Sequence, residues 1–200
     1  MKLGDTILFL DESKFEGTAY RTAHNWLPIL DVDWYAERPI NYLEIGAHYG
    51  ANVISVANTY AAHECSKVYA IDPWADYDEY SEYDGQQKTI FKTYKENIDR
   101  AGVSDKVETI RGFSHKEVHF FPDSFFNIIY VDGNHEKEYV LEDGVISFRK
   151  LKKGGIIIFD DYGWCDREDY KIAVDSFIAV FKDKIDVLGL EKSQMFIKKL

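Results

Sequence analysis

Short apolar runs alternate with segments of helical periodicity along most of this chain. A short continuous apolar run that ends at a turn residue is typical of a buried strand, whereas apolar positions three and four residues apart indicate a helix. The pattern predicts strands at 42–46, 67–71, 107–111, 128–131, 156–159, 185–188 and 194–197. It predicts helices at 50–60, 86–101, 140–151 and 170–181.

This alternation predicts an α/β fold with helices on both faces of a central, mostly parallel seven-stranded sheet. The helix over 140–151 is expected to end with Lys152 and Lys153 in its last turn and Gly154-Gly155 as its stop signal. The last two strands are expected to form an antiparallel C-terminal hairpin around residues 190–192.

Acidic residues follow two of the predicted parallel strands. Asp132 comes directly after the strand at 128–131, with His135 three residues later, and Asp160-Asp161 follow the strand at 156–159. Because strands joined by one helix run parallel, their carboxyl ends share one edge of the sheet, where α/β proteins bind ligands. Crowded carboxylates repel unless a divalent cation joins them, so a metal site is predicted. The alternative is that Asp160 and Asp161 cap a loop or helix.

A glycine-containing turn follows the first predicted core strand. Gly46 and Gly50 flank this turn and let the backbone approach a ligand, and a helix N-terminus with unpaired N–H groups lies behind it. Asp72 ends the second strand at the place where nucleotide-binding folds hold ribose hydroxyls, and Trp74 could stack on a purine. A surface turn and a packed aromatic side chain are the alternatives.

Length and composition indicate one ordinary globular domain. The chain has 200 residues, 46% of them hydrophobic and 30% charged. A net charge of −11 argues against nucleic acid as a partner. Cys65 and Cys165 match neither a disulfide framework nor a metal motif, and neither a signal peptide nor a membrane span is recognisable, so a cytoplasmic protein without membrane association is expected.

Two segments are less readily interpreted. Residues 1–39 form an N-terminal helical and aromatic arm of the same domain, and residues 40–200 form its main part. The arm either packs on the sheet, covers the ligand-binding edge or joins two copies of the chain in a homo-oligomer. Residues 75–85 are acidic and rich in tyrosine, which is typical of a solvated loop, with a lid over the site as the alternative.

Three motifs resemble class I S-adenosylmethionine-dependent methyltransferases, and the resemblance covers about residues 40–200. LEIGAHYGAN resembles their cofactor loop, YAIDPW their ribose-binding acid, and KLKKGGIIIFDDY their turn into strand five. His48 replaces the middle glycine of the common loop, and the same departure from the common pattern occurs in metal-dependent catechol and sugar O-methyltransferases. The resemblance implies a Rossmann-like class I methyltransferase fold.

Two further motifs, VDGNHEKEY and FDDY, resemble a smaller group within this superfamily, the macrolide sugar O-methyltransferases. This resemblance implies Mg²⁺ or Mn²⁺ held by Asp132, Asp160 and Asp161, with His135 as the catalytic base beside Asp132. Asp78, Glu79 and Glu82 are conceivable further metal ligands. The residues expected to bind S-adenosylmethionine are Glu44, Gly46, Asn52, Asp72, Trp74, Phe113, Ser114 and Asp132.

The sequence therefore predicts a metal-dependent O-methyltransferase that acts on a sugar or another small vicinal diol. A catalytically silent subunit that binds the cofactor as a scaffold is one alternative, and cofactor affinity without turnover would identify it. An NAD-dependent oxidoreductase is disfavoured because the phosphate-binding G-x-G-x-x-G pattern is absent.

Overall fold

The computed structural model describes residues 9–19, 23–76, 82–164 and 168–200 of the chain. Seven strands form one sheet in the order β3-β2-β1-β4-β5-β7-β6, and the first five of these are parallel neighbours. The strands are β1 (Asn41–Ile45), β2 (Lys67–Asp72), β3 (Val107–Arg111), β4 (Phe126–Val131), β5 (Leu151–Phe159), β6 (Ile185–Glu191) and β7 (Gln194–Lys199). Strand β7 is antiparallel to both β5 and β6, so the predicted fold class is confirmed.

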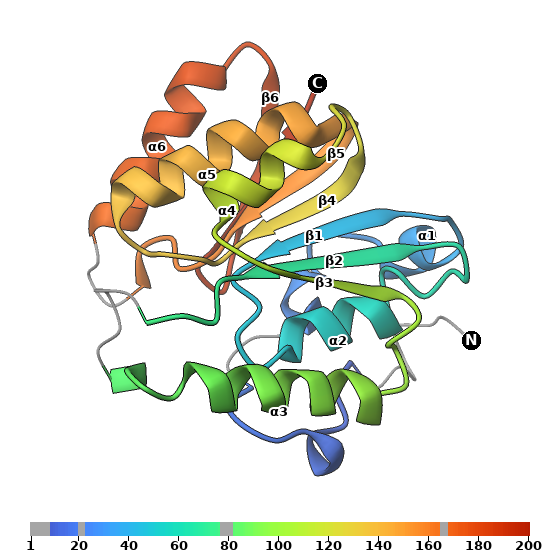
Figure 1. Cartoon of the computed structure of the whole chain (residues 1–200). Helices are drawn as coiled ribbons and strands as arrows, with labels where there is room; N and C mark the ends of the chain where they lie inside the picture. Colours follow the sequence, from blue (N-terminus) through green and yellow to red (C-terminus); the bar gives the residue numbers. More distant parts are fainter. Residues whose placement is uncertain (1–8, 20–22, 77–81, 165–167) are drawn as a thin grey trace.

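Helices cover both faces of the sheet (Figure 1). One face carries α4 (Ser114–Glu117), α5 (Lys137–Lys150) and α6 (Glu168–Phe181), and the other carries α2 (Ala51–Asn58) and α3 (Gln87–Arg100). Neighbouring strand residues such as Tyr42 and Leu43 are both fully buried, in separate apolar clusters. Burial on both faces explains why the central strands are continuously apolar in the sequence.

The boundary between α5 and β5 differs from the prediction. Helix α5 ends at Lys150, and Leu151 has the extended angles φ −74° and ψ 133° and pairs with Phe126. The predicted helix end and glycine cap therefore lie within β5, where the register with β4 shifts. Gly154 has a φ of +78°, so the glycines accommodate a bulge in the strand. Burial of Leu151 and its pairing with β4 outweighed the local helix-stop signal.

The closing hairpin is longer than predicted, with a tighter turn. Strand β6 extends to Glu191 and β7 begins at Gln194, so only Lys192 and Ser193 connect them. Both turn residues have positive φ, 50° and 62°, which is the conformation that matches the twist of a two-residue hairpin. Neither residue is a typical one for such a turn, so the sequence did not indicate its position.

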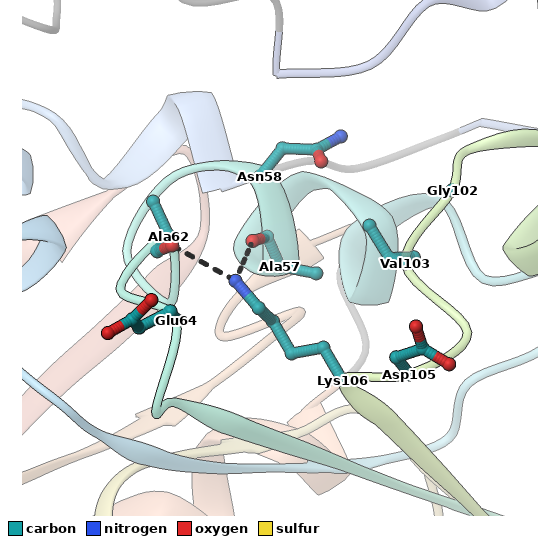
Figure 2. A pocket seen from close by; sticks show the side chains of 8 residues that line it. All are labelled: Ala57, Asn58, Ala62, Glu64, Gly102, Val103, Asp105 and Lys106. Atoms are coloured by element: carbon teal, nitrogen blue, oxygen red, sulfur yellow. Dashed lines mark hydrogen bonds between the residues drawn. The ribbon is translucent and has the colours of Figure 1, made fainter.

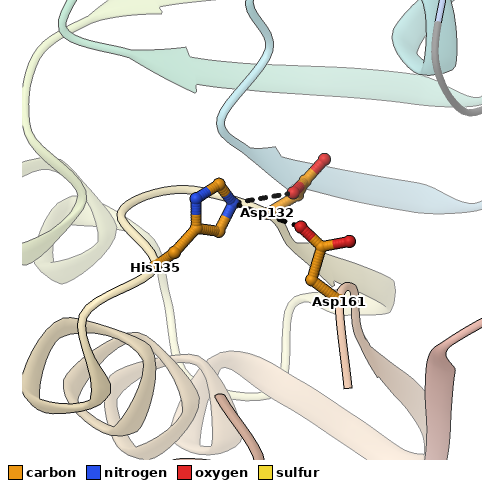
Figure 3. Close-up of side chains that lie close together, drawn as sticks. All are labelled: Asp132, His135 and Asp161. Atoms are coloured by element: carbon orange, nitrogen blue, oxygen red, sulfur yellow. Dashed lines mark hydrogen bonds and ion pairs between the residues drawn. The ribbon is translucent and has the colours of Figure 1, made fainter. Parts of the chain in front are cut away.

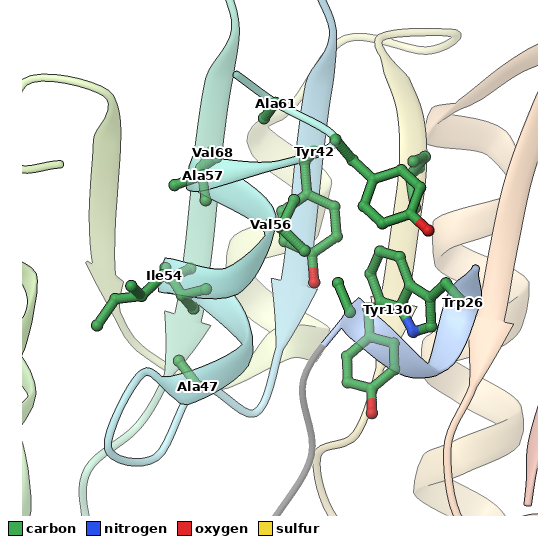
Figure 4. Close-up of a cluster of buried hydrophobic side chains, with 14 of the residues drawn as sticks. Trp26, Tyr42, Ala47, Ile54, Val56, Ala57, Ala61, Val68 and Tyr130 are labelled. Carbon is green, nitrogen blue, oxygen red and sulfur yellow. The ribbon is translucent and has the colours of Figure 1, made fainter. Parts of the chain in front are cut away.

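The described part of the N-terminal arm packs into the core (Figure 4). It contains the 3₁₀ segments Glu12–Lys14 and Ala23–Trp26 and the short helix α1 (Val32–Ala36). The fully buried Trp26 ring lies 6.1 Å from Tyr42, 5.3 Å from Tyr60 and 5.5 Å from Tyr130, measured between ring centroids. This segment thus covers the side of β1 and β4 that faces α2.

None of the described helices combines the length and apolar composition needed to cross a membrane. Cys65 is an exposed free thiol, and Cys165 lies outside the described residues.

Candidate functional site

The residues that follow the strands stay in register with the sheet at its carboxyl edge. The amide of Gly46 donates to the carbonyl of Ile71 at 2.9 Å, and the amide of Asp132 donates to the carbonyl of Ile45 at 2.9 Å. The amide of Asp160 donates to Val131 at 3.0 Å. The sheet thus places the glycine turn and the acidic residues side by side, as the parallel topology predicted.

Asp132, His135 and Asp161 form a compact group at this edge (Figure 3). His135 Nε2 lies 3.5 Å from Asp132 Oδ1 and 3.7 Å from Asp161 Oδ2, and one ligand atom of each residue lies within 4.8 Å of the others. The side chains are 27%, 10% and 14% exposed, so a small ion can reach them from solvent. The two carboxylates can hold one divalent cation, and the imidazole then lies beside it.

Asp160, unlike Asp161, is not a member of this group. It is 1% exposed, and its Oδ2 accepts a 2.7 Å hydrogen bond from the Tyr130 hydroxyl. That hydroxyl in turn accepts a 2.9 Å hydrogen bond from Gln194 Nε2. The structure therefore brings together Asp132 and Asp161, two of the three predicted metal ligands. The third member of the group is His135, the predicted base, and Asp160, the third predicted ligand, is hydrogen-bonded to Tyr130 instead.

A strained turn directs the Asp161 carboxylate toward His135. Asp161 has a φ of +55°, a left-handed conformation that costs a non-glycine residue about 1 kcal/mol. The turn is tied down by the Tyr162 amide, which donates to the Ser193 carbonyl at 2.8 Å, and by the Trp164 amide, which donates to Asp161 at 3.1 Å. These contacts stabilise the turn, and the Asp161 carboxylate lies 3.7 Å from His135 Nε2.

Glu44 lies in a buried polar group on the neighbouring strand. It accepts hydrogen bonds from the Tyr42 hydroxyl at 2.5 Å and from Asn52 Nδ2 at 3.0 Å. Burial raises the pKa of Glu44 to about 8, and the charges of Asp132 and Asp160 add to this rise while the two hydrogen bonds oppose it. Asn52 Oδ1 is buried and has no hydrogen-bond partner among the described residues, so it is an acceptor available to a ligand.

The raised pKa of Glu44 predicts a pH-dependent stability. Because the folded protein retains this proton up to about pH 8 and the unfolded chain releases it near pH 4.5, stability should fall as pH rises through this interval. Glu44→Gln should reduce that fall, measured as the urea midpoint at pH 5 and pH 8 without added metal or cofactor. Glu64→Gln, at an exposed site, is the control and should follow the wild type. Parallel pH profiles for Glu44→Gln and wild type would contradict this assignment.

The glycine turn is constrained by the protein itself. Gly46 has a φ of +89°, and a Cβ at this position would lie 1.8 Å from the carbonyl oxygen of Asp132. The Asp72 carboxylate accepts the amides of His48 at 2.9 Å and Trp74 at 2.7 Å. Burial raises the pKa of Asp72, and these backbone hydrogen bonds oppose the rise. Asp72 therefore organises the turn beside which it was predicted to bind ribose.

The two candidates for adenine stacking have very different surroundings. Trp74 is 1% exposed, and its ring packs 4.7 Å from both Phe91 and Tyr94, between ring centroids. Its Nε1 donates to the His48 carbonyl at 2.9 Å, so Trp74 stabilises the glycine turn that contains His48. Phe113 is 40% exposed and precedes Ser114 at the start of α4. Of the two rings, only that of Phe113 is exposed enough for a ligand to contact it.

Three contributors to this site were missed in the sequence. Tyr130 donates to Asp160, Gln194 donates to Tyr130, and Asp143 on α5 is 3% exposed and packs on Gly133 in the turn after β4. A tyrosine inside an apolar strand and an aspartate on an apolar helix face were available signals. Of the further metal ligands considered, Asp78 and Glu79 lie outside the described residues, and Glu82 is exposed and outside the group described above.

A surface pocket lies away from these residues (Figure 2). Lys106 lines it and donates to the carbonyls of Ala57, Ala61 and Ala62 at 3.4, 2.7 and 3.1 Å. Lys106 directly precedes β3, so the pocket is at the amino ends of the strands. Its ammonium group caps the end of α2, which is a structural role.

Comparison with known proteins identifies the kind of domain. Residues 43–162 match the model of a family described as a methyltransferase domain. Uncharacterized protein R132 of Acanthamoeba polyphaga mimivirus is 27% identical over 175 residues, which cover 84% of this chain and 70% of that protein.

Solved structures of several methyltransferases share the fold. The O-methyltransferase NovP is 19% identical with a TM-score of 0.65, covering 88% of this chain and 78% of that chain. The Podospora anserina methyltransferase PaMTH1, solved with S-adenosylhomocysteine bound, is 19% identical with a TM-score of 0.57, covering 84% and 77%. At these identities the likeness establishes the fold alone.

Proposed function

We infer that this chain, which belongs to the methyltransferase domain family, transfers a methyl group from S-adenosylmethionine to a hydroxyl oxygen of a small acceptor with the aid of a divalent cation. The observation that carries this proposal is the group formed by Asp132, His135 and Asp161 at the carboxyl edge of the sheet. Carboxylate oxygens are the ligands that Mg²⁺ and Mn²⁺ prefer. The acceptor class proposed is a sugar or another vicinal diol, whose neighbouring oxygens can chelate the ion.

The cofactor is assigned to the glycine turn and its neighbours. Asp72 would bind the ribose hydroxyls, because each of its oxygens has acceptor capacity beyond the backbone amide that it already accepts. Glu44, Gly46 and Asn52 would receive the methionine end, where the unpartnered Asn52 Oδ1 suits an ammonium group. The adenine would lie against Phe113 and Ser114.

Asp132 and Asp161 would hold the cation, and His135 would act on the acceptor. A divalent cation lowers the pKa of a hydroxyl group that it binds. His135 as the neutral imidazole can accept the proton that this hydroxyl loses. The turns after β4 and β5 would position the three side chains before the acceptor binds, and such positioning would lower the barrier by several kcal/mol, on the order given for well-oriented reactions.

Asp72→Ala tests the cofactor assignment. Loss of the ribose contacts should weaken S-adenosylhomocysteine binding by about 1–3 kcal/mol, measured by isothermal titration calorimetry. Asp105→Ala, an exposed acid at the opposite edge of the sheet, should leave affinity unchanged. Because Asp72 also holds the turn, the unliganded melting temperature of each variant is measured alongside. Equal affinity of Asp72→Ala and wild type would rule out the ribose role.

The complete proposal is tested by transfer of a labelled methyl group from S-adenosylmethionine to a panel of diols, with catechol and methyl α-D-mannopyranoside as first probes. Methylated product in the presence of Mg²⁺ is the expected result. Tight S-adenosylhomocysteine binding without transfer to any hydroxyl in a broad panel would instead favour the scaffold alternative.

A further inference from the structure

A buried side-chain amide on α3 joins the N-terminal arm to the glycine turn. Asn97 is 1% exposed, and both its nitrogen and its oxygen are fully used in hydrogen bonds. Its Nδ2 donates to the carbonyl of Tyr49 in the glycine turn at 2.9 Å and to the carbonyl of Glu16 in the arm at 2.8 Å. Its Oδ1 accepts the Glu16 amide at 3.0 Å and the Arg100 guanidinium at 2.9 Å. One side chain therefore binds the backbone of two segments that are distant in the sequence.

The next residue of the arm packs directly on the same turn. Gly17 has a φ of +97°, and a Cβ at this position would lie 2.6 Å from Cγ and Cδ1 of the Tyr49 ring. Only a glycine allows this approach, because any side chain would have to displace the ring. The arm thus contacts the glycine turn in two ways, directly at Gly17 and through Asn97 at Glu16.

The glycine turn has a conformation that depends on support from other elements. His48 has a φ of +46°, which residues other than glycine adopt rarely. Its amide donates to the Asp72 carboxylate at 2.9 Å, and its carbonyl accepts from Trp74 Nε1 at 2.9 Å. The next carbonyl, that of Tyr49, accepts from Asn97. Because such a backbone persists only where its surroundings hold it, loss of the last contact should let the turn relax.

We propose that Asn97, Glu16 and Gly17 form a brace that holds the glycine turn in its cofactor-binding conformation, so that docking of the arm and binding of the cofactor favour each other. The inference rests on the assignment of S-adenosylmethionine to this turn in the proposed function. Asn97 is a positioning residue, because it acts through the carbonyl of Tyr49. A turn that is held before the ligand binds loses less freedom on binding, which raises the affinity.

The affinity for S-adenosylhomocysteine, measured by isothermal titration calorimetry, tests the brace. Asn97→Asp keeps the size of the side chain but removes both donors, so it should weaken binding by about tenfold, the order of one lost hydrogen bond. Asn127→Asp is the matched control. Asn127 Oδ1 accepts from the Asn41 amide at 3.0 Å and from Lys152 at 2.8 Å, at the amino edge of the sheet. This variant should bind as wild type does.

A substitution in the arm tests the same brace without changing α3 or the turn. The methyl group added in Gly17→Ala would meet the Tyr49 ring, so this variant should also weaken binding. Combined with Asn97→Asp, its effect should be smaller than alone, because both changes release the same contact between arm and turn. Gly154→Ala is the control, since Gly154 also has a positive φ, +78°, but a Cβ there would have no atom within 4 Å. It should bind as wild type does.

Hydrogen exchange distinguishes the brace from a purely structural role. Because coupling between two sites is reciprocal, S-adenosylhomocysteine should slow amide exchange in residues 11–19 of the wild type, and this protection should shrink in Asn97→Asp. If Asn97 only stabilises the fold, Asn97→Asp would lower the melting temperature, but the folded variant would bind with wild-type affinity. That outcome would overturn the proposal. Should Asn97→Asp not fold, equal affinity of Gly17→Ala and wild type would overturn it.

The result separates this inference from the proposed function. A wild type that fails to bind S-adenosylhomocysteine would refute the cofactor assignment and this inference together. A wild type that binds, with Asn97→Asp and Gly17→Ala binding equally well, would refute this inference alone. Mn²⁺ binding, followed by electron paramagnetic resonance, should be unchanged in both variants because Asp132 and Asp161 are retained.

Discussion

Replacing His135 by glutamine is expected to reduce turnover by about 10²–10⁴-fold, the range typical of losing a general base. Glutamine keeps a polar side chain of similar reach but accepts no proton at neutral pH. The imidazole is 10% exposed, and its Nε2 faces both Asp132 and Asp161, so an acceptor bound to a cation on these carboxylates would have its hydroxyl near the ring. Single-turnover rates at saturating Mg²⁺ would measure the effect directly.

Binding measurements make this prediction specific. S-adenosylhomocysteine affinity should be unchanged in His135→Gln, because the cofactor assignment does not include this side chain. His119→Gln, at an exposed position, is the control and should retain full activity. The His135 ring also packs 5.0 Å from the Tyr170 ring, between centroids, which is the contact that a purely structural role would use. Retention of most of the turnover by His135→Gln would mean that the histidine only shapes the turn after β4.

Removal of divalent cations is expected to abolish turnover, and added Mg²⁺ or Mn²⁺ should restore it. Without a cation, the acceptor hydroxyl keeps a high pKa and the carboxylates of Asp132 and Asp161 repel each other. Incubation with EDTA followed by dialysis and a metal titration would measure this dependence. Full activity in the presence of chelator would show that the group formed by Asp132, His135 and Asp161 works without a metal.

Two adjacent aspartates offer a matched comparison for the metal ligands. Asp161→Asn should raise the Mn²⁺ concentration for half-maximal activity by at least about tenfold, because it removes a charged ligand. Asp160→Asn should change this requirement much less and should instead lower stability, because the Asp160 carboxylate accepts the hydroxyl of Tyr130 in the core. Direct Mn²⁺ binding should rank the two variants in the same order. A larger loss of Mn²⁺ affinity in Asp160→Asn than in Asp161→Asn would reverse the assignment.

The hydrophobic pattern was sufficient to predict the strands, the principal helices and the edge of the sheet at which the candidate site lies. This follows from topology, because two buried neighbouring strands connected by one helix run parallel, and their carboxyl ends then lie at the same edge of the sheet. Asp132, Asp160 and the glycine turn were therefore placed correctly at one edge, although 28 residues separate the two acids. The antiparallel hairpin at the end of the sheet was likewise predictable from two short strands with a brief connection.

Element boundaries were less predictable because they depend on contacts distant in sequence. Gly154-Gly155 after two lysines resembles a helix stop, but Leu151 gains more from burial beside Phe126 than from another helical turn. Trp74 follows the end of β2, and its position in the sequence predicts a ring that stacks on the cofactor's adenine. The rings of Phe91 and Tyr94 on α3 enclose it instead, and the spacing along β2 contains no information about that helix.

The sequence by itself thus determined the α/β topology, the edge of the sheet that carries the site and the residue types gathered there. Only the tertiary structure decided which carboxylate oxygens converge. Asp160 and Asp161 are neighbours with the same side chain. Asp161, in a left-handed turn, has its carboxylate 3.7 Å from His135 Nε2, whereas the carboxylate of Asp160 is buried and accepts a hydrogen bond from Tyr130. Side-chain direction depends on backbone angles and on packing partners far away in the chain, and neither can be derived from local residue patterns.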